Sequence, residues 1–334
     1  MKKILFANTY FYPLDHKQWL MRQPYPPLGT LYAAAVMRSA GYDVSLHDVS
    51  LLDDPFSISK PLQEQRPDYL VIYDDGFNYL TKMCLTVMRQ AALQMLQLGK
   101  EHGCVTVVCS SDSTDHYKLY LENGADYIVR GEGEQSLLEL IKTIDRNEAP
   151  LAVEGVAFKV LQGFCLPAPR AVSKQLDLLP FPVWDLVDIE AYRHVWEERG
   201  TPFYLNVATT RGCPYKCNWC AKPIYGTRYN SRSPENVVAE LNYLYTRFGV
   251  DHFWMCDDIF GLKPGWVSAF AKMIEKENLH VHYKIQSRAD LLLEEAPVKA
   301  CVSYGLDEAW LGAESGSQKI LDAMDKGIRV EQIH

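Results

Sequence analysis

The sequence predicts an α/β protein in two parts, a doubly wound, Rossmann-like parallel sheet followed by part of a TIM-like (β/α) barrel. The first observation is that residues 1–145 alternate short apolar runs with helical patterns, as the βαβ units of a parallel sheet do. The second is that this alternation resumes after residue 200 as four strand–helix units in a row, which indicates part of a barrel. A length of 334 residues agrees with about two domains.

Five strands are expected in the first part, within residues 3–10, 43–49, 68–75, 104–111 and 125–131. A helix is expected within 26–42, where two prolines mark its start and Gly41 its end. A doubly wound sheet binds its ligands outside the carboxyl ends of its strands. The loops expected at those ends are 8–12, 73–77, 110–116 and 130–134.

Residues 146–200 look like a linker, with a short hairpin in 155–172 and a proline-punctuated joint in 176–186. The strands of the second part are expected within 203–210, 252–258, 281–292 and 308–315. Ser233 is expected to cap the helix of 233–249, with Pro234 at its first position. We therefore expect domains at 1–145 and 201–334, joined by 146–200.

Composition excludes several classes of protein. The net charge of −8 argues against a nucleic-acid partner, because phosphate binding requires a basic surface. No apolar run approaches the ~20 residues of a membrane span, and the start of the chain favours a first strand over a signal peptide. The nine cysteines are odd in number and mostly scattered, which favours a reducing cytoplasm.

Three cysteines are gathered in "RGCPYKCNWC" (residues 211–220), directly after the first strand of the second part. Structural zinc normally takes four protein ligands, so a zinc knuckle here needs a fourth from Cys256 or a histidine. An iron–sulfur cube also usually takes four thiolates. A cube held by three alone leaves one iron open to a small molecule.

The CxxxCxxC spacing after a first barrel strand resembles the signature of the radical S-adenosylmethionine (SAM) superfamily. Further stretches resemble the subfamily with an N-terminal cobalamin-binding domain: "LPFPVWDL", "RYNSRSPENVVAEL", "CDDIF", "SRADLL" and "GAESGSQKILDAMDKG". The resemblance covers nearly the whole chain. It implies that Cys213, Cys217 and Cys220 ligate a [4Fe–4S] cluster whose fourth iron holds SAM.

The resemblance also implies further contacts to SAM at the ends of the barrel strands. The residues concerned are Trp219 for the adenine, Asp257 and Asp258 for the ammonium, Arg288 for the carboxylate, and Glu314 and Ser315 for the ribose. Carboxylates suit an ammonium and a guanidinium suits a carboxylate. The alternatives are salt bridges or caps at the strand ends, and a core position for Trp219.

By the same resemblance, the first part binds cobalamin at the carboxyl ends of its strands. The matching residues are Pro27, Leu28, Gly29, Ser110, Ser111, Gly131, Glu132 and Gly133. Two departures from the family stand out. The first is that the cobalt-ligating Asp-x-His-x-x-Gly motif is absent, so His16 in "PLDHKQW" is expected to be a surface residue. The second is that residues 109–116 lack the Gly-Gly-Pro-His stretch that relatives often have, so the usual shape of that loop is not expected.

These features predict a cobalamin-dependent radical SAM methyltransferase acting on an unactivated carbon of a small molecule. The resemblance implies an electron donor such as flavodoxin or ferredoxin. An oxidative cyclase resembling the anaerobic magnesium-protoporphyrin ester cyclase is the alternative reaction. Because the family continues with further strand–helix units after residue 334, a C-terminally truncated, non-catalytic cluster-binding fragment is the alternative of another class.

Overall fold

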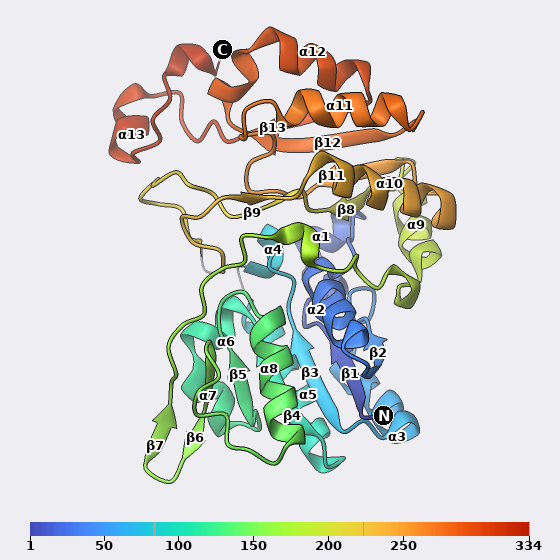
Figure 1. Ribbon diagram of the computed structural model, residues 1–334, viewed down its shortest axis with the longest axis vertical. Coiled ribbons are helices and arrows are strands. Elements are labelled where there is room, and N and C mark those ends of the chain that lie inside the picture. Colours follow the sequence, from blue (N-terminus) through green and yellow to red (C-terminus); the bar gives the residue numbers. More distant parts are fainter. Residues whose placement is uncertain (83–84, 223, 334) are drawn as a thin grey trace. The chain divides into compact units, whose positions relative to one another are not determined.

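The structure, a computed structural model, describes residues 1–82, 85–222 and 224–333 (Figure 1). The chain divides into two compact units. The N-terminal unit consists of Met1–Val172 and Leu179–Thr201, and the C-terminal unit of Ser173–Leu178 and Pro202–His334. The segment Leu179–Thr201, which includes α9 (Ile189–Glu197), therefore packs with the first unit.

The N-terminal unit is built on a seven-stranded sheet with the order β2-β1-β3-β4-β5-β6-β7. Its first five strands are parallel, as the sequence predicts. The predicted hairpin also forms, as β6 and β7, but it extends one edge of this sheet in antiparallel fashion, whereas the sequence pattern assigns it to the linker. The strands are β1 (Lys3–Ala7), β2 (Asp43–His47), β3 (Tyr69–Tyr73), β4 (Val105–Cys109), β5 (Tyr127–Val129), β6 (Val156–Val160) and β7 (Gly163–Cys165). Strand order reverses between β1 and β3, the position where open α/β sheets bind ligands.

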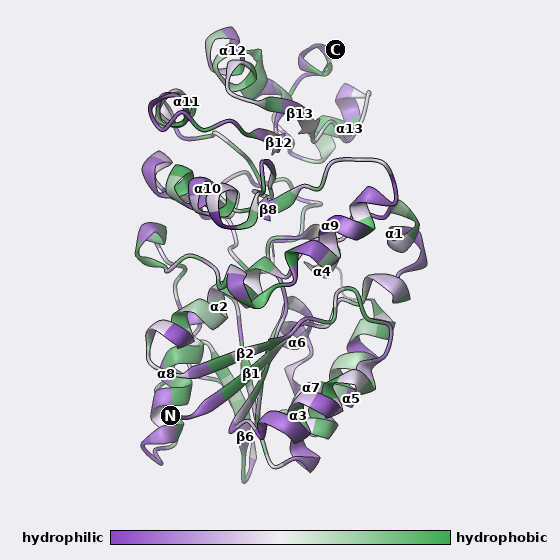
Figure 2. Cartoon of the chain, turned by 90° about the vertical axis from the view of Figure 1, so that its right-hand side faces the viewer, coloured by the Kyte–Doolittle hydropathy of each residue, from purple (hydrophilic) through white to green (hydrophobic). Residues whose placement is uncertain are grey.

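Helices cover both faces of this sheet. In Figure 2, α2 and α8 lie on one side of the strands, and α3, α5 and α7 lie on the other. The helices of the unit besides α9 are α1 (His16–Met21), α2 (Leu28–Ser39), α3 (Ser59–Gln65), α4 (Tyr79–Lys82), α5 (Thr86–Glu101), α6 (Ser111–Asp115), α7 (Tyr117–Glu122) and α8 (Glu134–Asp145). Because both faces are covered, β3 is buried along its whole length, which explains its continuous apolar run.

The C-terminal unit contains a four-stranded sheet of the order β13-β12-β11-β8, parallel throughout. Its strands are β8 (Leu205–Val207), β11 (His252–Met255), β12 (His282–Ser287) and β13 (Leu306–Leu311). A separate antiparallel pair is formed by β9 (Thr210–Arg211) and β10 (Asn230–Ser231). Within the described residues this sheet stays open, so the unit is part of a barrel, as predicted.

The helices of this unit follow its strands, as the sequence pattern indicates. They are α10 (Pro234–Phe248), α11 (Trp266–Lys276), α12 (Glu295–Ser303) and α13 (Gln318–Ala323). The predicted cap of α10 is confirmed, since the Ser233 side chain accepts a hydrogen bond from the Asn236 amide (3.1 Å). In Figure 2, α10, α11 and α12 lie on one side of the strands.

Short 3₁₀ turns complete the described secondary structure: η1 (Tyr12–Leu14), η2 (Pro55–Ile58), η3 (Leu176–Leu178), η4 (Trp184–Leu186), η5 (Ala289–Leu293) and η6 (Val330–Gln332). None of the helices in the described ranges combines the length and the apolar character needed to cross a bilayer.

Candidate active site

The three clustered cysteines lie on a loop whose two ends are held together by the β9–β10 pair. Arg211 pairs with Asn230, and Thr210 with Ser231. Gly212 follows directly, with a φ of 82°, and a Cβ at this position would lie 2.2 Å from the Arg228 carbonyl oxygen. A glycine is therefore required where the loop leaves the pair, because any side chain meets both a steric clash and an unfavourable backbone conformation.

The thiols of the loop are accessible. Cys213 and Cys217 are half-buried and Cys220 is exposed, and burial raises the pKa of the Cys213 thiol. The Lys222 ammonium donates hydrogen bonds to the carbonyl oxygens of Cys213 and Tyr215, so a positive charge lies beside the thiols. Such a charge favours the thiolate form that a metal requires.

The spacing of the thiols differs from that of a single-ion site. A tetrahedral zinc site with Zn–S bonds near 2.3 Å brings its sulfurs to about 3.8 Å from one another. Among the described residues, three or more potential ligand atoms come within 4.8 Å of one another only at His252, His282 and Asp307. Neither the three thiols nor a combination with Cys256 forms such a group among the described residues.

Two contacts fix the cysteine loop against the last elements of the unit. The Asn218 side chain donates to the Ala323 carbonyl oxygen (2.7 Å), and its amide donates to that of Met324 (3.0 Å). The Arg288 guanidinium, at the carboxyl end of β12, lies 3.7 Å from the centroid of the Tyr215 ring. The loop is thus positioned by residues more than seventy positions away in the sequence.

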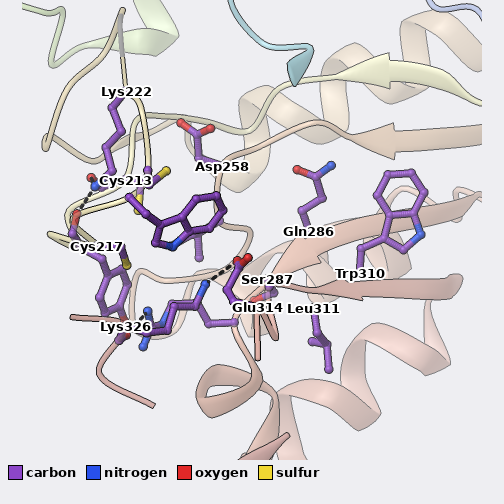
Figure 3. Close-up of a pocket in the computed structure, with 16 residues that line it drawn as sticks. Cys213, Cys217, Lys222, Asp258, Gln286, Ser287, Trp310, Leu311, Glu314 and Lys326 are labelled. Carbon is purple, nitrogen blue, oxygen red and sulfur yellow. Dashed lines mark hydrogen bonds and ion pairs between the residues drawn. The ribbon is translucent and has the colours of Figure 1, made fainter. Parts of the chain in front are cut away.

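A cavity of about 320 Å³ opens between this loop and the carboxyl ends of β11, β12 and β13 (Figure 3). Its wall is formed by the cysteine loop together with polar and aromatic side chains at the strand ends. The lining residues are Cys213, Tyr215, Cys217, Trp219, Cys220, Lys222, Asp258, Ile259, Gln286, Ser287, Arg288, Trp310, Leu311, Gly312, Glu314 and Lys326.

Most of the residues predicted to contact SAM line this cavity. They are Trp219, Asp258, Arg288 and Glu314. Trp219 has a relative exposure of 51%, so it is no core residue. Glu314 adopts the left-handed region at φ 63° and pairs with Lys326 (Oε1–Nζ 3.0 Å), as Figure 3 shows.

Asp257 and Ser315 do not line the cavity. Asp257 is buried, and its carboxylate accepts hydrogen bonds from the amides of Thr209 (2.7 Å) and Thr210 (2.8 Å) and from the Thr209 hydroxyl. Burial raises the pKa of Asp257 to about 6, while these hydrogen bonds act in the opposite direction. Asp257 therefore joins the end of β11 to the turn between β8 and β9, which carries the cysteine loop.

Sequence reasoning missed several lining residues. Tyr215 and Lys222 lie within or beside the cysteine motif, and Lys326 lies in the stretch "DAMDKG". Each could therefore have been identified as a candidate from these motifs. Gln286 and Trp310 are interior positions of β12 and β13, and no sequence pattern distinguishes their side chains from core residues.

The residues predicted to contact cobalamin lie at the carboxyl edge of the N-terminal sheet. Pro27, Leu28 and Gly29 begin α2; Ser110 and Ser111 follow β4; Gly131, Glu132 and Gly133 follow β5. Ser110 caps α6: its side chain accepts from the Ser113 amide (2.9 Å), and its amide donates to the Ser113 hydroxyl (3.0 Å). This capping box gives residues 110–116 a helical shape in place of the family's usual loop.

Two of these glycines allow close packing within the chain itself. A Cβ on Gly29 would lie 3.1 Å from the Asp75 Cα, and one on Gly133 would lie 2.6 Å from the Cys109 sulfur. Gly29 donates its amide to the Asp75 carboxylate (3.1 Å), and Gly133 donates its amide to the Tyr73 hydroxyl (3.2 Å). The structure thus gives both a packing role at the carboxyl edge.

His16 is exposed at the start of α1, as the sequence predicts. The neighbouring Asp15 caps this helix by accepting from the Gln18 amide (3.2 Å), and it also accepts from the Tyr10 hydroxyl (2.7 Å). The Asp-His pair of the sequence therefore forms a helix start.

Comparison with known proteins identifies the C-terminal unit. Residues 207–334 match the Radical SAM superfamily. An uncharacterized methyltransferase of Pyrococcus horikoshii is 28% identical over 313 residues, which are 92% of this chain and 64% of the relative. The anaerobic magnesium-protoporphyrin IX monomethyl ester cyclase of Synechocystis is 25% identical over 312 residues, 92% of this chain and 60% of the relative. The chain thus spans less than two thirds of these relatives.

Solved structures match over both units. The cobalamin-dependent S-adenosylmethionine radical enzyme OxsB, with aqua-cobalamin and S-adenosylmethionine bound, superimposes with a TM-score of 0.81 at 20% identity, covering 99% of this chain and 46% of that one. The radical S-adenosylmethionine methyltransferase TsrM of Kitasatospora setae, with cobalamin and a [4Fe–4S] cluster bound, superimposes with a TM-score of 0.77 at 16% identity. This match covers 100% of this chain and 66% of TsrM. These matches confirm the predicted fold class. The cysteine loop and its cavity thus lie in a radical SAM superfamily domain, residues 207–334, of a chain that has the fold of the cobalamin-dependent radical SAM enzymes.

Proposed function

We propose that the chain binds a [4Fe–4S] cluster and SAM in the cavity of the C-terminal unit and uses them for cobalamin-dependent methylation. The observation that carries this proposal is that three cysteines on one loop face a cavity lined by Trp219, Asp258, Arg288 and Glu314. These side chains come from separate segments of the chain. If these polar residues served only as salt bridges at the strand ends, they would not be expected to surround one accessible cysteine loop.

The donor set fits the cluster. Cys213, Cys217 and Cys220 supply three soft thiolates, which are the ligands of iron–sulfur clusters. When bound, such a cluster supplies the single electron that cleaves the C5′–S bond of SAM to methionine and a 5′-deoxyadenosyl radical. The electron comes from a donor such as flavodoxin or ferredoxin.

The strand-end residues fit SAM. Arg288 donates to both Asp290 carboxylate oxygens (2.9 and 3.3 Å) and to the Lys326 carbonyl oxygen (2.9 Å). These bonds use three of its five N–H groups and orient the buried guanidinium, which is proposed to bind the SAM carboxylate. Asp258 is proposed to accept from the SAM ammonium, Glu314 to accept from ribose hydroxyls, and Trp219 to contact adenine; all three line the cavity.

The N-terminal unit is proposed to bind cobalamin at the carboxyl edge of its sheet. The strand order 2-1-3-4-5, with its switch point at β1 and β3, supports this assignment, as does the fold match to OxsB over both units. Ser110, Ser111 and Glu132 are nearly buried polar residues at this edge, and they are the groups proposed to face the cofactor's amides. His16 is not proposed as a cobalt ligand, since it is exposed at the start of α1.

The proposed reaction is transfer of a methyl group from SAM, through cobalamin, to an unactivated carbon of a small molecule. The relative from Pyrococcus horikoshii is named an uncharacterized methyltransferase, and this similarity favours methylation. Similarity to magnesium-protoporphyrin ester cyclases, at 25 to 27% identity, favours an oxidative cyclisation as the second candidate.

Anaerobic reconstitution tests the cluster. We expect about four irons and four sulfides per chain, and loss of the visible charge-transfer absorbance in each of the alanine variants of Cys213, Cys217 and Cys220. Cys165→Ala is the matched control, since this half-buried cysteine lies on β7 of the N-terminal unit and outside the cysteine motif. One zinc per chain with no iron uptake overturns the cluster assignment.

Methyl-labelled SAM separates the two reactions. With reductant, hydroxocobalamin and SAM carrying a deuterated methyl group, a methyltransferase forms deuterated methylcobalamin, which mass spectrometry detects before any substrate is known. A cyclase leaves the label in SAM and methionine. Formation of 5′-deoxyadenosine without label in cobalamin therefore supports the second candidate.

A further inference from the structure

A second cluster of metal-ligating side chains lies in the C-terminal unit, away from the cysteine loop. One nitrogen of His252, one of His282 and one carboxylate oxygen of Asp307 lie within 4.8 Å of one another. His252 and His282 are the first residues of β11 and β12, and Asp307 is the second residue of β13. The cluster is therefore at the amino ends of the strands, whereas the cavity of the candidate active site is at their carboxyl ends.

The backbone holds the two imidazoles side by side. His252 and His282 are directly aligned in the parallel pairing of β11 and β12, and their rings stack with centroids 4.6 Å apart. The His282 amide donates to the Asp251 carbonyl oxygen (2.7 Å), which ties the starts of the two strands together. The placement of the rings thus comes from the sheet rather than from rotamers alone.

Asp307 reaches the imidazoles from a bulge. Tyr283 aligns with Leu306 and Lys284 with Glu308, so Asp307 is an extra residue between them. Such bulges redirect a side chain out of the regular register. The preceding Gly305 allows this approach, because a Cβ there would lie 1.8 Å from the Val281 carbonyl oxygen.

The carboxylate of Asp307 is oriented on both of its oxygens. Oδ1 lies 3.1 Å from His282 Nδ1, and Oδ2 accepts a hydrogen bond from the Tyr204 hydroxyl (3.0 Å). Tyr204 also packs its ring edge-on against His252, with centroids 5.1 Å apart. Tyr204 directly precedes β8, so the amino ends of all four strands contribute to this cluster.

We propose that His252, His282 and Asp307 form a binding site for one divalent transition-metal cation of zinc-like chemistry. Two imidazoles and one carboxylate are ligands that Zn²⁺ accepts, whereas Mg²⁺ and Ca²⁺ prefer oxygen alone. Ligand atoms around tetrahedral zinc lie about 3.4 Å apart, from bond lengths near 2.05 Å. The 3.1 Å between His282 Nδ1 and Asp307 Oδ1 is close to this value, and the His252 nitrogen lies within 4.8 Å of both atoms.

Outer groups support the same assignment. His252 Nδ1 is 2.7 Å from the Asp251 carboxylate, the arrangement in which a carboxylate orients a metal-ligating imidazole and leaves the lone pair on Nε2. The His282 side chain is 52% exposed, so solvent reaches the site and supplies the fourth ligand. The bound ion connects three neighbouring strands at their amino ends and therefore stabilises the folded unit.

Zinc titration of the full chain tests the site. Because free thiolates are also ligands for zinc, the parent protein carries alanine at Cys213, Cys217 and Cys220. We expect this parent to bind about one Zn²⁺ per chain in competition with a chromophoric chelator, and Co²⁺ to give visible d–d bands without thiolate charge transfer. His252→Ala, His282→Ala and Asp307→Asn should each weaken binding by at least tenfold, and Asp251→Asn by about tenfold.

His280→Ala is the matched control, because His280 is an exposed histidine two residues before His282 that lies outside the cluster. The zinc affinity of the His280→Ala variant should equal that of the parent. If the parent fails to fold, the same substitutions are compared in the wild-type chain after cluster reconstitution, with zinc measured separately from iron. Absence of zinc binding in the parent, or unchanged binding after both histidine substitutions, shows a hydrogen-bonded histidine pair without an ion and overturns the proposal.

Discussion

The Arg288 guanidinium lies 3.7 Å from the centroid of the Tyr215 ring, and this contact joins the end of β12 to the cysteine loop. Arg288 is 4% exposed, and Asp290 and the Lys326 carbonyl oxygen hold its guanidinium in place. One residue therefore orients the loop and also faces the cavity in which SAM is proposed to bind. The proposed SAM binding would therefore depend on the position of the loop through this side chain.

Removal of the Tyr215 ring should loosen the cluster. A cation–π contact contributes about 0.5 to 2 kcal/mol, so we expect Tyr215→Leu to release iron to a ferrous chelator roughly two- to thirtyfold faster than the wild type. Tyr215→Phe keeps the ring face and should behave as the wild type. Equal release rates for the leucine and phenylalanine variants would show that the ring does not hold the loop.

An alanine at Gly212 should prevent cluster assembly, whereas an alanine at Gly226 should not. Both glycines have a positive φ, 82° and 61°, so both substitutions carry a backbone cost of roughly 1 to 2 kcal/mol. Only at Gly212 does a Cβ meet the chain, 2.2 Å from the Arg228 carbonyl oxygen, while nothing lies within 4 Å at Gly226. The iron content of the two reconstituted variants measures the difference, and equal loss in both would assign the effect to φ alone.

Asp257 should make stability depend on pH between about 4 and 6. Burial raises the pKa of this carboxyl to about 6, above its ordinary value of 3.8. In this window the folded chain therefore binds more protons than the unfolded chain, and the free energy of unfolding falls as pH rises. For two pKa units the loss is on the order of 2 to 3 kcal/mol.

Asp257→Asn removes this titration. The urea midpoint of the wild type should fall more steeply between pH 4.5 and 6.5 than that of the variant. The comparison of slopes cancels the contribution of Asp74, whose pKa burial also raises to about 6. Parallel slopes would mean that the hydrogen bonds from Thr209 and Thr210 keep the carboxylate ionised throughout.

His16 and Asp15 should respond differently to alanine. His16 is exposed, so His16→Ala should leave cobalamin affinity and the cob(II)alamin resonance lines unchanged. Asp15 caps α1, so Asp15→Ala should lower the free energy of unfolding by about 0.5 to 2 kcal/mol, measured by urea denaturation. A change from nitrogen-coordinated to nitrogen-free lines in His16→Ala would identify His16 as the cobalt ligand.

The sequence by itself determined the strands, the main helices and the cysteine loop. These features depend on local patterns. A short stretch of sequence is enough to recognise an apolar run, a cap such as Ser233 or the spacing of the three cysteines. Their confirmation reflects agreement between local preference and final fold. The strand ends carrying Asp258, Arg288 and Glu314 were also predictable, since parallel strands bring their carboxyl ends to one edge.

Only the tertiary structure decided what each side chain at those ends does. Asp257 and Asp258 are adjacent in sequence, but their side chains point in different directions, so one is buried against Thr209 and the other lines the cavity. Gly29 and Gly133 meet Asp75 and Cys109 through contacts distant in sequence. The His252, His282 and Asp307 cluster depends on strand register and a bulge, and no spacing in the chain encodes either.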